Sequence, residues 1–197
     1  KLMRLFILNP MRPFEISDIR KRASVGVSTA RREIKTLLKS KFIKPKIFFK
    51  TIIGKRKGAN TGYKKKLSGF IFNETFPFVG ECKTMLMAAT PLRGNSIVRR
   101  FGRAGRLKLL VTSGVFLQEP ESRLDLMIVG DRLNKGVVDR TVRSLEGEIG
   151  KELRYAVFET PDFNYRLSVY DRLVRDVLDY PHQKLLVKMG LKQGERV

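Results

Sequence analysis

The apolar positions among the first forty residues predict three short helices. The apolar run of residues 3–8 ends at a proline and predicts a short buried helix. Two good N-cap residues, Ser17 and Ser28, predict the starts of a second and a third helix, and the third runs to about Lys39.

Apolar and basic residues fall on opposite sides of the third predicted helix. Four apolar residues recur at helical spacing and form one stripe: Ala30, Ile34, Leu37 and Leu38. The opposite side is basic, and a short helix, a turn and a helix with a basic outer face make the helix-turn-helix pattern, whose second helix reads the major groove of DNA. The residues that we expect to contact DNA from this helix are Ser28, Thr29, Arg31, Arg32, Lys35, Thr36 and Lys39.

A basic hairpin is predicted directly after these helices. Residues 42–53 are rich in β-branched and aromatic side chains and predict a strand, and residues 63–67 predict its return. The turn between them, residues 54–62, is basic and rich in glycine. Such a hairpin beside a helix-turn-helix is typical of a wing, whose cations hold DNA phosphates. The cations that we assign to this role are Lys55, Arg56, Lys57, Lys64, Lys65 and Lys66.

The positive charge is confined to one half of the chain. The 197 residues hold 41 Lys and Arg against 19 Asp and Glu, a formal net charge of +22. Residues 1–108 hold 27 cations and 5 acids, whereas residues 109–197 hold 14 of each. No apolar run is long enough to span a membrane, and the single cysteine, Cys82, excludes an internal disulfide. We therefore expect a cytoplasmic protein whose first half binds nucleic acid and which does not bind membranes.

Residues 1–67 resemble a winged helix domain of the kind common in bacterial and archaeal transcription regulators. The resemblance implies that this domain binds double-stranded DNA. A solvated basic face without a ligand and an RNA-binding module are the alternatives. Residues 68–106 predict a helical connector, with one helix over residues 81–89 that packs between domains or dimerises. We expect Met85, Leu86 and Met87 of this helix to lie in a core.

Residues 107–197 predict an α/β domain. Strands are expected over residues 107–112, 123–129 and 153–158, with a long helix opened by Asn134 between the last two. An amphipathic helix over residues 169–178 follows them. Strands that alternate with helices in this way indicate a sheet covered by helices.

Residues 105–182 resemble the minimal nucleotidyltransferase domain of the polymerase-β-like superfamily. The resemblance rests on the segments LLVTSGVFLQEPESRLDLMIVGD and LEGEIGKELRYAVFETPDFNYR and on the helix ending in VLDYP. In that family a Gly-Ser turn holds the triphosphate and an Asp-x-Asp pair binds two Mg²⁺. Here the turn reads Ser113-Gly114, and the paired acids read Arg123-Leu124-Asp125, so a cation stands in place of one metal ligand.

We therefore expect a degenerate domain with no catalytic residues, no bound metal and no cofactor. Arg123 and Asp125 are i,i+2 neighbours on a predicted strand, which predicts a direct ion pair between them. The domain then serves as a homodimerisation platform or senses a nucleotide or other small-molecule effector. The pocket residues for an effector would be Ser113, Gly114, Arg123 and Asp125.

The favoured prediction is a dimeric transcription regulator with a two-part α+β and α/β fold. A winged helix would form its N-terminal part, and a nucleotidyltransferase-like α/β domain its C-terminal part. The competing function is an active nucleotidyltransferase that uses its basic half to recruit an RNA or protein acceptor.

Overall fold

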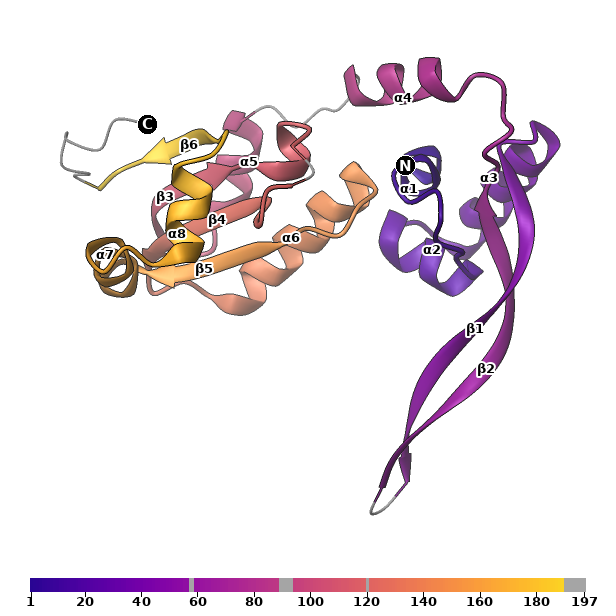
Figure 1. Ribbon diagram of the computed structural model, residues 1–197, viewed down its shortest axis with the longest axis horizontal. Helices are drawn as coiled ribbons and strands as arrows, with labels where there is room; N and C mark the ends of the chain where they lie inside the picture. Colours follow the sequence, from indigo (N-terminus) through magenta and orange to yellow (C-terminus); the bar gives the residue numbers. More distant parts are fainter. Residues whose placement is uncertain (57–58, 89–93, 120, 190–197) are drawn as a thin grey trace. The chain divides into compact units, whose positions relative to one another are not determined.

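The chain forms a mixed α and β structure with two separate sheets, as predicted at the coarsest level (Figure 1). It is seen in a computed structural model that describes residues 1–56, 59–88, 94–119 and 121–189. Contacts divide the chain into two compact units, which we call the hairpin unit (residues 1–90 and 144–151) and the sheet unit (residues 91–143 and 152–197). Within the described ranges, every helix is too short or too polar to cross a membrane.

The hairpin unit begins with three helices and continues into a long antiparallel hairpin, which extends away from the helices (Figure 1). Each strand has 14 residues, and the pairing runs without a register shift from Ile43↔Phe72 to Arg56↔Ala59. A fourth helix follows the hairpin. The elements are α1 (Leu2–Ile7), α2 (Ile16–Ala23), α3 (Val27–Lys39), β1 (Ile43–Arg56), β2 (Ala59–Phe72) and α4 (Val79–Ala88).

Aromatic side chains join the base of the hairpin to the helices. Phe14, between α1 and α2, forms an antiparallel bridge with Phe70 of β2 through backbone hydrogen bonds of 2.8 and 2.9 Å. The ring of Phe14 packs edge-on against Phe6 of α1, and Phe42 packs in the same way against Phe72. The hairpin therefore starts from the hydrophobic core that the helices share.

Three details of the predicted hairpin unit are wrong. The helices α2 and α3 begin at Ile16 and Val27, ahead of Ser17 and Ser28, and no side chain caps either helix. The hairpin is longer than predicted: β1 continues to Arg56 into the predicted turn, and β2 extends beyond residues 63–67 at both ends, because cross-strand pairing, which the sequence pattern does not record, continues there. Met85, which we expected in a core, is 56% exposed.

The sheet unit is built on a four-stranded sheet of order β5-β4-β3-β6. The strand β4 runs antiparallel to β3 and parallel to β5, and β6 runs antiparallel to β3. The elements are α5 (Gly94–Phe101), β3 (Arg106–Thr112), the short 3-10 helix η1 (Gly114–Phe116), β4 (Leu126–Asp131), α6 (Lys135–Ile149), β5 (Tyr155–Glu159), α7 (Thr160–Ser168), α8 (Arg172–Leu178) and β6 (Gln183–Val187).

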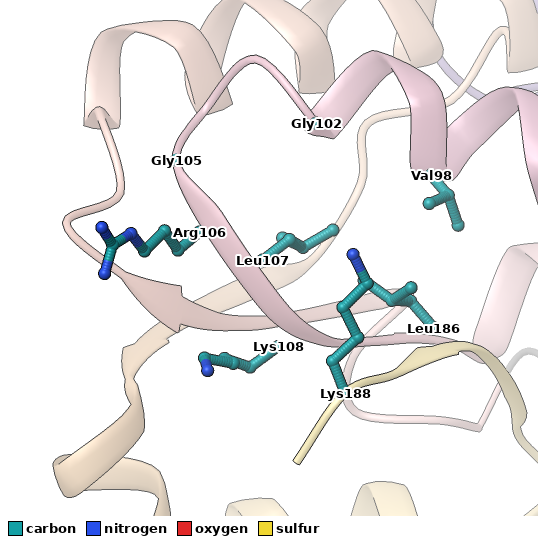
Figure 2. A pocket seen from close by; sticks show the side chains of 8 residues that line it. All are labelled: Val98, Gly102, Gly105, Arg106, Leu107, Lys108, Leu186 and Lys188. Carbon is teal, nitrogen blue, oxygen red and sulfur yellow. The ribbon is translucent and has the colours of Figure 1, made fainter.

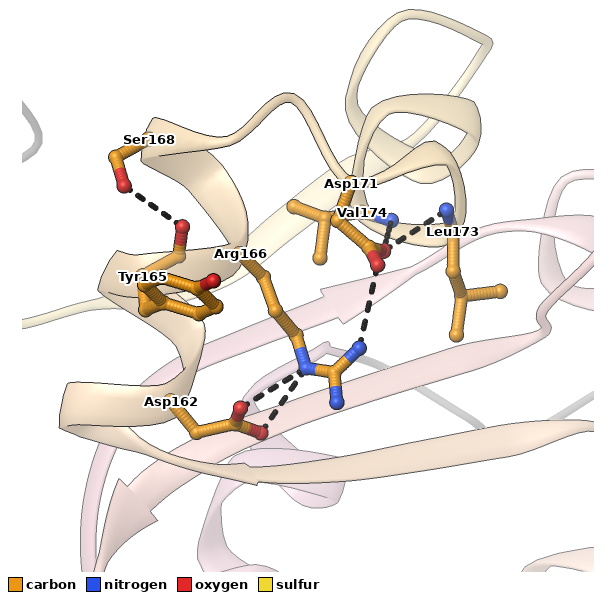
Figure 3. A network of polar contacts seen from close by, with 7 residues as sticks. All are labelled: Asp162, Tyr165, Arg166, Ser168, Asp171, Leu173 and Val174. Atoms are coloured by element: carbon orange, nitrogen blue, oxygen red, sulfur yellow. Dashed lines mark hydrogen bonds and ion pairs between the residues drawn. The ribbon is translucent and has the colours of Figure 1, made fainter.

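Helices α7 and α8 pack on this sheet and are locked to each other by a polar network. Phe163 of α7 and Val174 of α8 are fully buried against side chains of β3 and β4. The guanidinium of Arg166 donates to the carboxylates of Asp162, at 3.0 Å, and of Asp171, at 3.2 Å, and Figure 3 shows it between the two. Asp171 also accepts hydrogen bonds from the first backbone N–H groups of α8 and caps that helix. Asp162 and Asp171 therefore stabilise the packing of α7 and α8.

The strand boundaries of this unit also differ from the prediction. Strand β4 begins at Leu126, three residues later than expected, because residues 122–125 have no regular secondary structure. Helix α8 begins at Arg172, where Asp171 caps it. Strand β6 was not predicted at all, since its five residues, two polar followed by three apolar, do not alternate and show no sign of their distant partner in β3.

Candidate nucleic-acid interface

The outer side of α3 exposes every cation that the sequence assigned to it. Ala30 and Ile34 are buried at 0% and 4% exposure, so the apolar stripe faces the core as predicted. Of the α3 residues that we expected to contact DNA, Thr29 is half-buried and the others are exposed: Ser28, Arg31, Arg32, Lys35, Thr36 and Lys39.

Local contacts leave the cations of α3 accessible. The guanidinium of Arg32 lies 3.8 Å from the carboxylate of Glu33, and the Arg32 side chain is still 76% exposed. The hydroxyl of Thr36 donates a hydrogen bond to the Arg32 carbonyl at 3.2 Å, which leaves its methyl group free to face a ligand. An exposed ion pair of this length contributes little to stability and is easily exchanged for a phosphate contact.

The basic residues of the hairpin are divided between its two faces. Lys64, Lys65 and Lys66 are exposed, and because consecutive strand residues alternate, Lys65 lies on one face and its two neighbours on the other. Lys55 and Arg56 lie at the far end of β1, opposite Asn60 and Ala59. Lys57 falls outside the described residues.

Lys50 ties the hairpin to α2, a contact that the sequence did not reveal. Its ammonium lies 3.1 Å from Asp18 and 3.5 Å from Glu15. The hydrogen bond to Asp18 is the main cause that raises the pKa of Lys50 above its ordinary value of 10.5. Two of the few acids in the basic half are therefore occupied by a lysine of the hairpin itself.

Asp125 is buried beside the turn that follows β3, at 1% exposure. One carboxylate oxygen accepts the backbone N–H of Val115 at 2.8 Å, and the other accepts the backbone N–H of Arg154 at 2.8 Å. The Arg154 guanidinium lies 3.3 Å from the same carboxylate. Asp125 therefore holds two backbone segments and one cation together.

Ser113 and Gly114, the two residues of the turn, pack against the segment that contains Asp125. The Ser113 hydroxyl is buried and donates to the Leu124 carbonyl at 2.6 Å. Gly114 has φ of +54°, and a Cβ at this position would collide with the Asp125 carboxylate. A glycine is needed here for both reasons.

The predicted ion pair between Arg123 and Asp125 is wrong. Arg123 instead pairs with Asp176 of α8, with Nε and Oδ2 2.6 Å apart. The two residues precede β4 and do not lie on one face of a strand, which removes the basis of the prediction.

The surroundings of Asp125 do not fit a two-magnesium centre, because both of its oxygens accept hydrogen bonds and its nearest charge is a cation. In the part of the chain that the structure describes, no three His, Cys, Asp or Glu residues gather as metal ligands.

A cavity of about 330 Å³ lies at the start of β3, at the other end of that strand from the Ser113-Gly114 turn (Figure 2). Its apolar lining includes Val98, Leu107 and Leu186. Figure 2 shows that Arg106 and Lys108 leave β3 on the side away from Lys188. None of the four predicted effector residues lines this cavity.

Three ion-pair partners were beyond sequence reasoning: Lys50 for Asp18, Arg154 for Asp125 and Asp176 for Arg123. Each meets its partner across a gap of about thirty residues or more, and none stands in a motif. Only the pairing of β4 with β5 brings Arg154 to Asp125, and that pairing is a property of the fold.

Comparisons of the chain with protein-family models, curated proteins and solved structures found no match.

Proposed function

We propose that the protein is a DNA-binding transcriptional regulator that reads duplex DNA with α3 and holds the phosphates with its hairpin. The observation that carries the proposal is the division of α3 into a buried apolar side and an exposed cationic side. This helix stands next to a hairpin that contains nine Lys and Arg and no Asp or Glu between Ile43 and Phe72. An acid-free cationic surface beside an exposed basic helix favours a polyanion as its ligand.

The winged helix is the form that we propose for this module. Support comes from the order of its elements, in which a short helix and a longer basic helix precede an antiparallel hairpin. The bridge between Phe14 and Phe70 supports it further, because it fixes the base of the hairpin beside the helices. The side chains of Arg32 and Lys35 would reach guanine acceptors, and Thr36 would contact a thymine methyl group.

The sheet unit, in this proposal, is a nucleotidyltransferase-like domain without catalysis. The turn after β3 and the buried Asp125 favour that role, because the groups that would bind a triphosphate and magnesium instead stabilise the turn. We propose homodimerisation as its function ahead of ligand sensing. Each edge strand of its sheet offers an exposed valine to a partner, Val157 on β5 and Val187 on β6.

Selection of duplex sequences from a random pool at physiological salt tests the proposal. We expect one motif to be enriched, and a log–log salt slope of roughly −5 if about six cations each neutralise a phosphate. A pool that stays random after selection would contradict sequence reading by α3. Tighter binding to structured RNA than to duplex DNA at matched salt would identify an RNA-binding module instead.

A further inference from the structure

The two faces of the hairpin have different surroundings. Residues of one face contact the rest of the unit: Phe48 is half-buried, and Lys50 is bound to Asp18. On the other face, which we call the outer face, Phe49 and Ile47 are 67% and 59% exposed. Large apolar side chains in water are unfavourable by about 25 cal/mol per Å² of apolar surface, so a ligand that covers them gains this energy.

Cations border the two exposed apolar side chains. Lys66 lies directly opposite Phe49 in the antiparallel register, and Lys64 lies one pair further along the same face. Side chains in such pairs stand about 5 Å apart, and diagonal neighbours about 7–8 Å apart. Because the hairpin has no acid, the charge of these lysines is not offset within it. The outer face therefore combines apolar contact with unneutralised positive charge.

This combination matches one nucleotide that has left its base stack. Phe49 and Ile47 are two residues apart on one strand, so their side chains are about 6.8 Å apart, twice the stacking distance of about 3.4 Å between neighbouring bases. A flat base fits between them, and its phosphates would meet Lys64 and Lys66. Aromatic rings and cations in one groove are the usual means of binding unstacked bases.

We propose that the outer face of the hairpin binds an unstacked nucleotide, with the base between Ile47 and Phe49 and the phosphates on Lys64 and Lys66. The inference rests on the proposed function and deepens it: the regulator prefers sites where the duplex is locally unpaired. A membrane surface fits less well, since two apolar side chains offer a narrow area for insertion into a bilayer.

The test compares two labelled DNAs, a mixed-sequence duplex and the same duplex with a central bubble of unpaired thymines, in binding titrations with the full chain. We expect the wild-type protein to bind the bubble about tenfold more tightly than the duplex, as the stacking of one base allows. Phe49→Ala should remove this preference and change the affinity for the duplex by less than about twofold. Phe49→Tyr keeps a ring and should keep the preference.

Phe78→Ala is the matched control. Phe78 is another exposed phenylalanine of the same unit, at 59% against 67% for Phe49, and it lies outside the hairpin. The control variant should bind both DNAs like the wild type. Circular dichroism of each variant checks that an altered affinity is not caused by unfolding.

Each outcome separates the inference from the proposed function. Equal wild-type affinity for the two DNAs, or a preference that survives Phe49→Ala, overturns the inference and leaves duplex binding intact. A Phe49-dependent preference for the bubble without measurable duplex binding supports the inference and overturns the proposed function. Phe49-dependent binding to anionic vesicles, with no preference between the DNAs, overturns the inference in favour of a lipid surface.

Discussion

A single carboxylate organises the turn after β3. Asp125 accepts two backbone N–H groups, which lie in segments that are distant in sequence, and its charge is balanced by Arg154. A buried carboxylate with these partners is stable because both oxygens are satisfied, whereas a carboxylate with unused oxygens at this depth would be costly. Asp125 therefore stabilises the turn and its two neighbouring backbone segments.

We predict that Asp125→Asn lowers the free energy of unfolding by about 2–4 kcal/mol. The amide has one acceptor oxygen, so its NH₂ group would face one of the two backbone donors and leave that donor unsatisfied. Urea unfolding followed by circular dichroism measures the loss. Asp162→Asn, an exposed acid in an ion pair, should lose about 0.5 kcal/mol or less. Equal losses in the two variants would show that Asp125 has no special structural role.

At the scale of elements, the proposed function gives α3 and the hairpin different tasks on DNA. The side chains of the helix would distinguish base pairs through directional donors, and the lysines of the strands would contact phosphates of any sequence. The two sets lie on different elements, and because both are exposed, truncating one of them leaves intact the core that α3 and the base of the hairpin share. Their contributions should therefore be separable by mutation.

We predict that Arg32→Ala reduces the affinity for the selected site by about 1–3 kcal/mol and has little effect on random duplex. Lys65→Ala should weaken binding to both sequences alike and reduce the magnitude of the salt slope by about 1. Titrations of the two DNAs at several salt concentrations measure both effects. If the two variants have the same sequence dependence, α3 does not read bases.

A second prediction for the hairpin concerns its anchor. Lys50→Met should lower the free energy of unfolding by less than about 1 kcal/mol, because the Lys50 side chain is 44% exposed and the solvent screens the ion pair. Its pKa is raised in the folded state, so the contribution is complete below the ordinary value of 10.5 and is lost as the pH rises through the raised value.

Urea unfolding of the wild type and of Lys50→Met at about pH 7 and about pH 12 measures this contribution. The difference between the two proteins should shrink at the higher pH. Lys46→Met, which alters an exposed lysine of the same strand, is the control. A difference that is as large at high pH as at neutral pH would show that the charge of Lys50 is not what anchors the hairpin.

Local patterns predicted the parts of this molecule that local forces decide. The buried and exposed sides of α3 follow from helical spacing alone, and Ala30 and Arg32 lie where that spacing put them. The extent of the hairpin and the existence of β6 depend on pairing between distant strands, which composition does not encode. The partners of Asp125 and Arg123 were missed for the same reason.

At the scale of the whole molecule, the excess positive charge lies in the first part of the chain. The excess of cations ends near residue 108, and several acids of residues 109–197 lie in ion pairs, such as Asp176 with Arg123 and Asp179 with Arg175. An overall charge of +22 thus reflects one strongly basic portion and one nearly neutral portion. High salt should weaken the contacts of the first portion much more than the packing of the second.

The unbroken register of the hairpin limits how its length can change. Removal of one residue from β1 ahead of Phe49 would exchange the two faces for the outer part of that strand. Phe49 would then lie at the position of Phe48, on the face that contacts the rest of the unit, and Lys50 would face outward. Paired changes, two residues in one strand and two in the other, would keep every side chain on its face. The hairpin is therefore free to lengthen or shorten only in whole steps of the pleat.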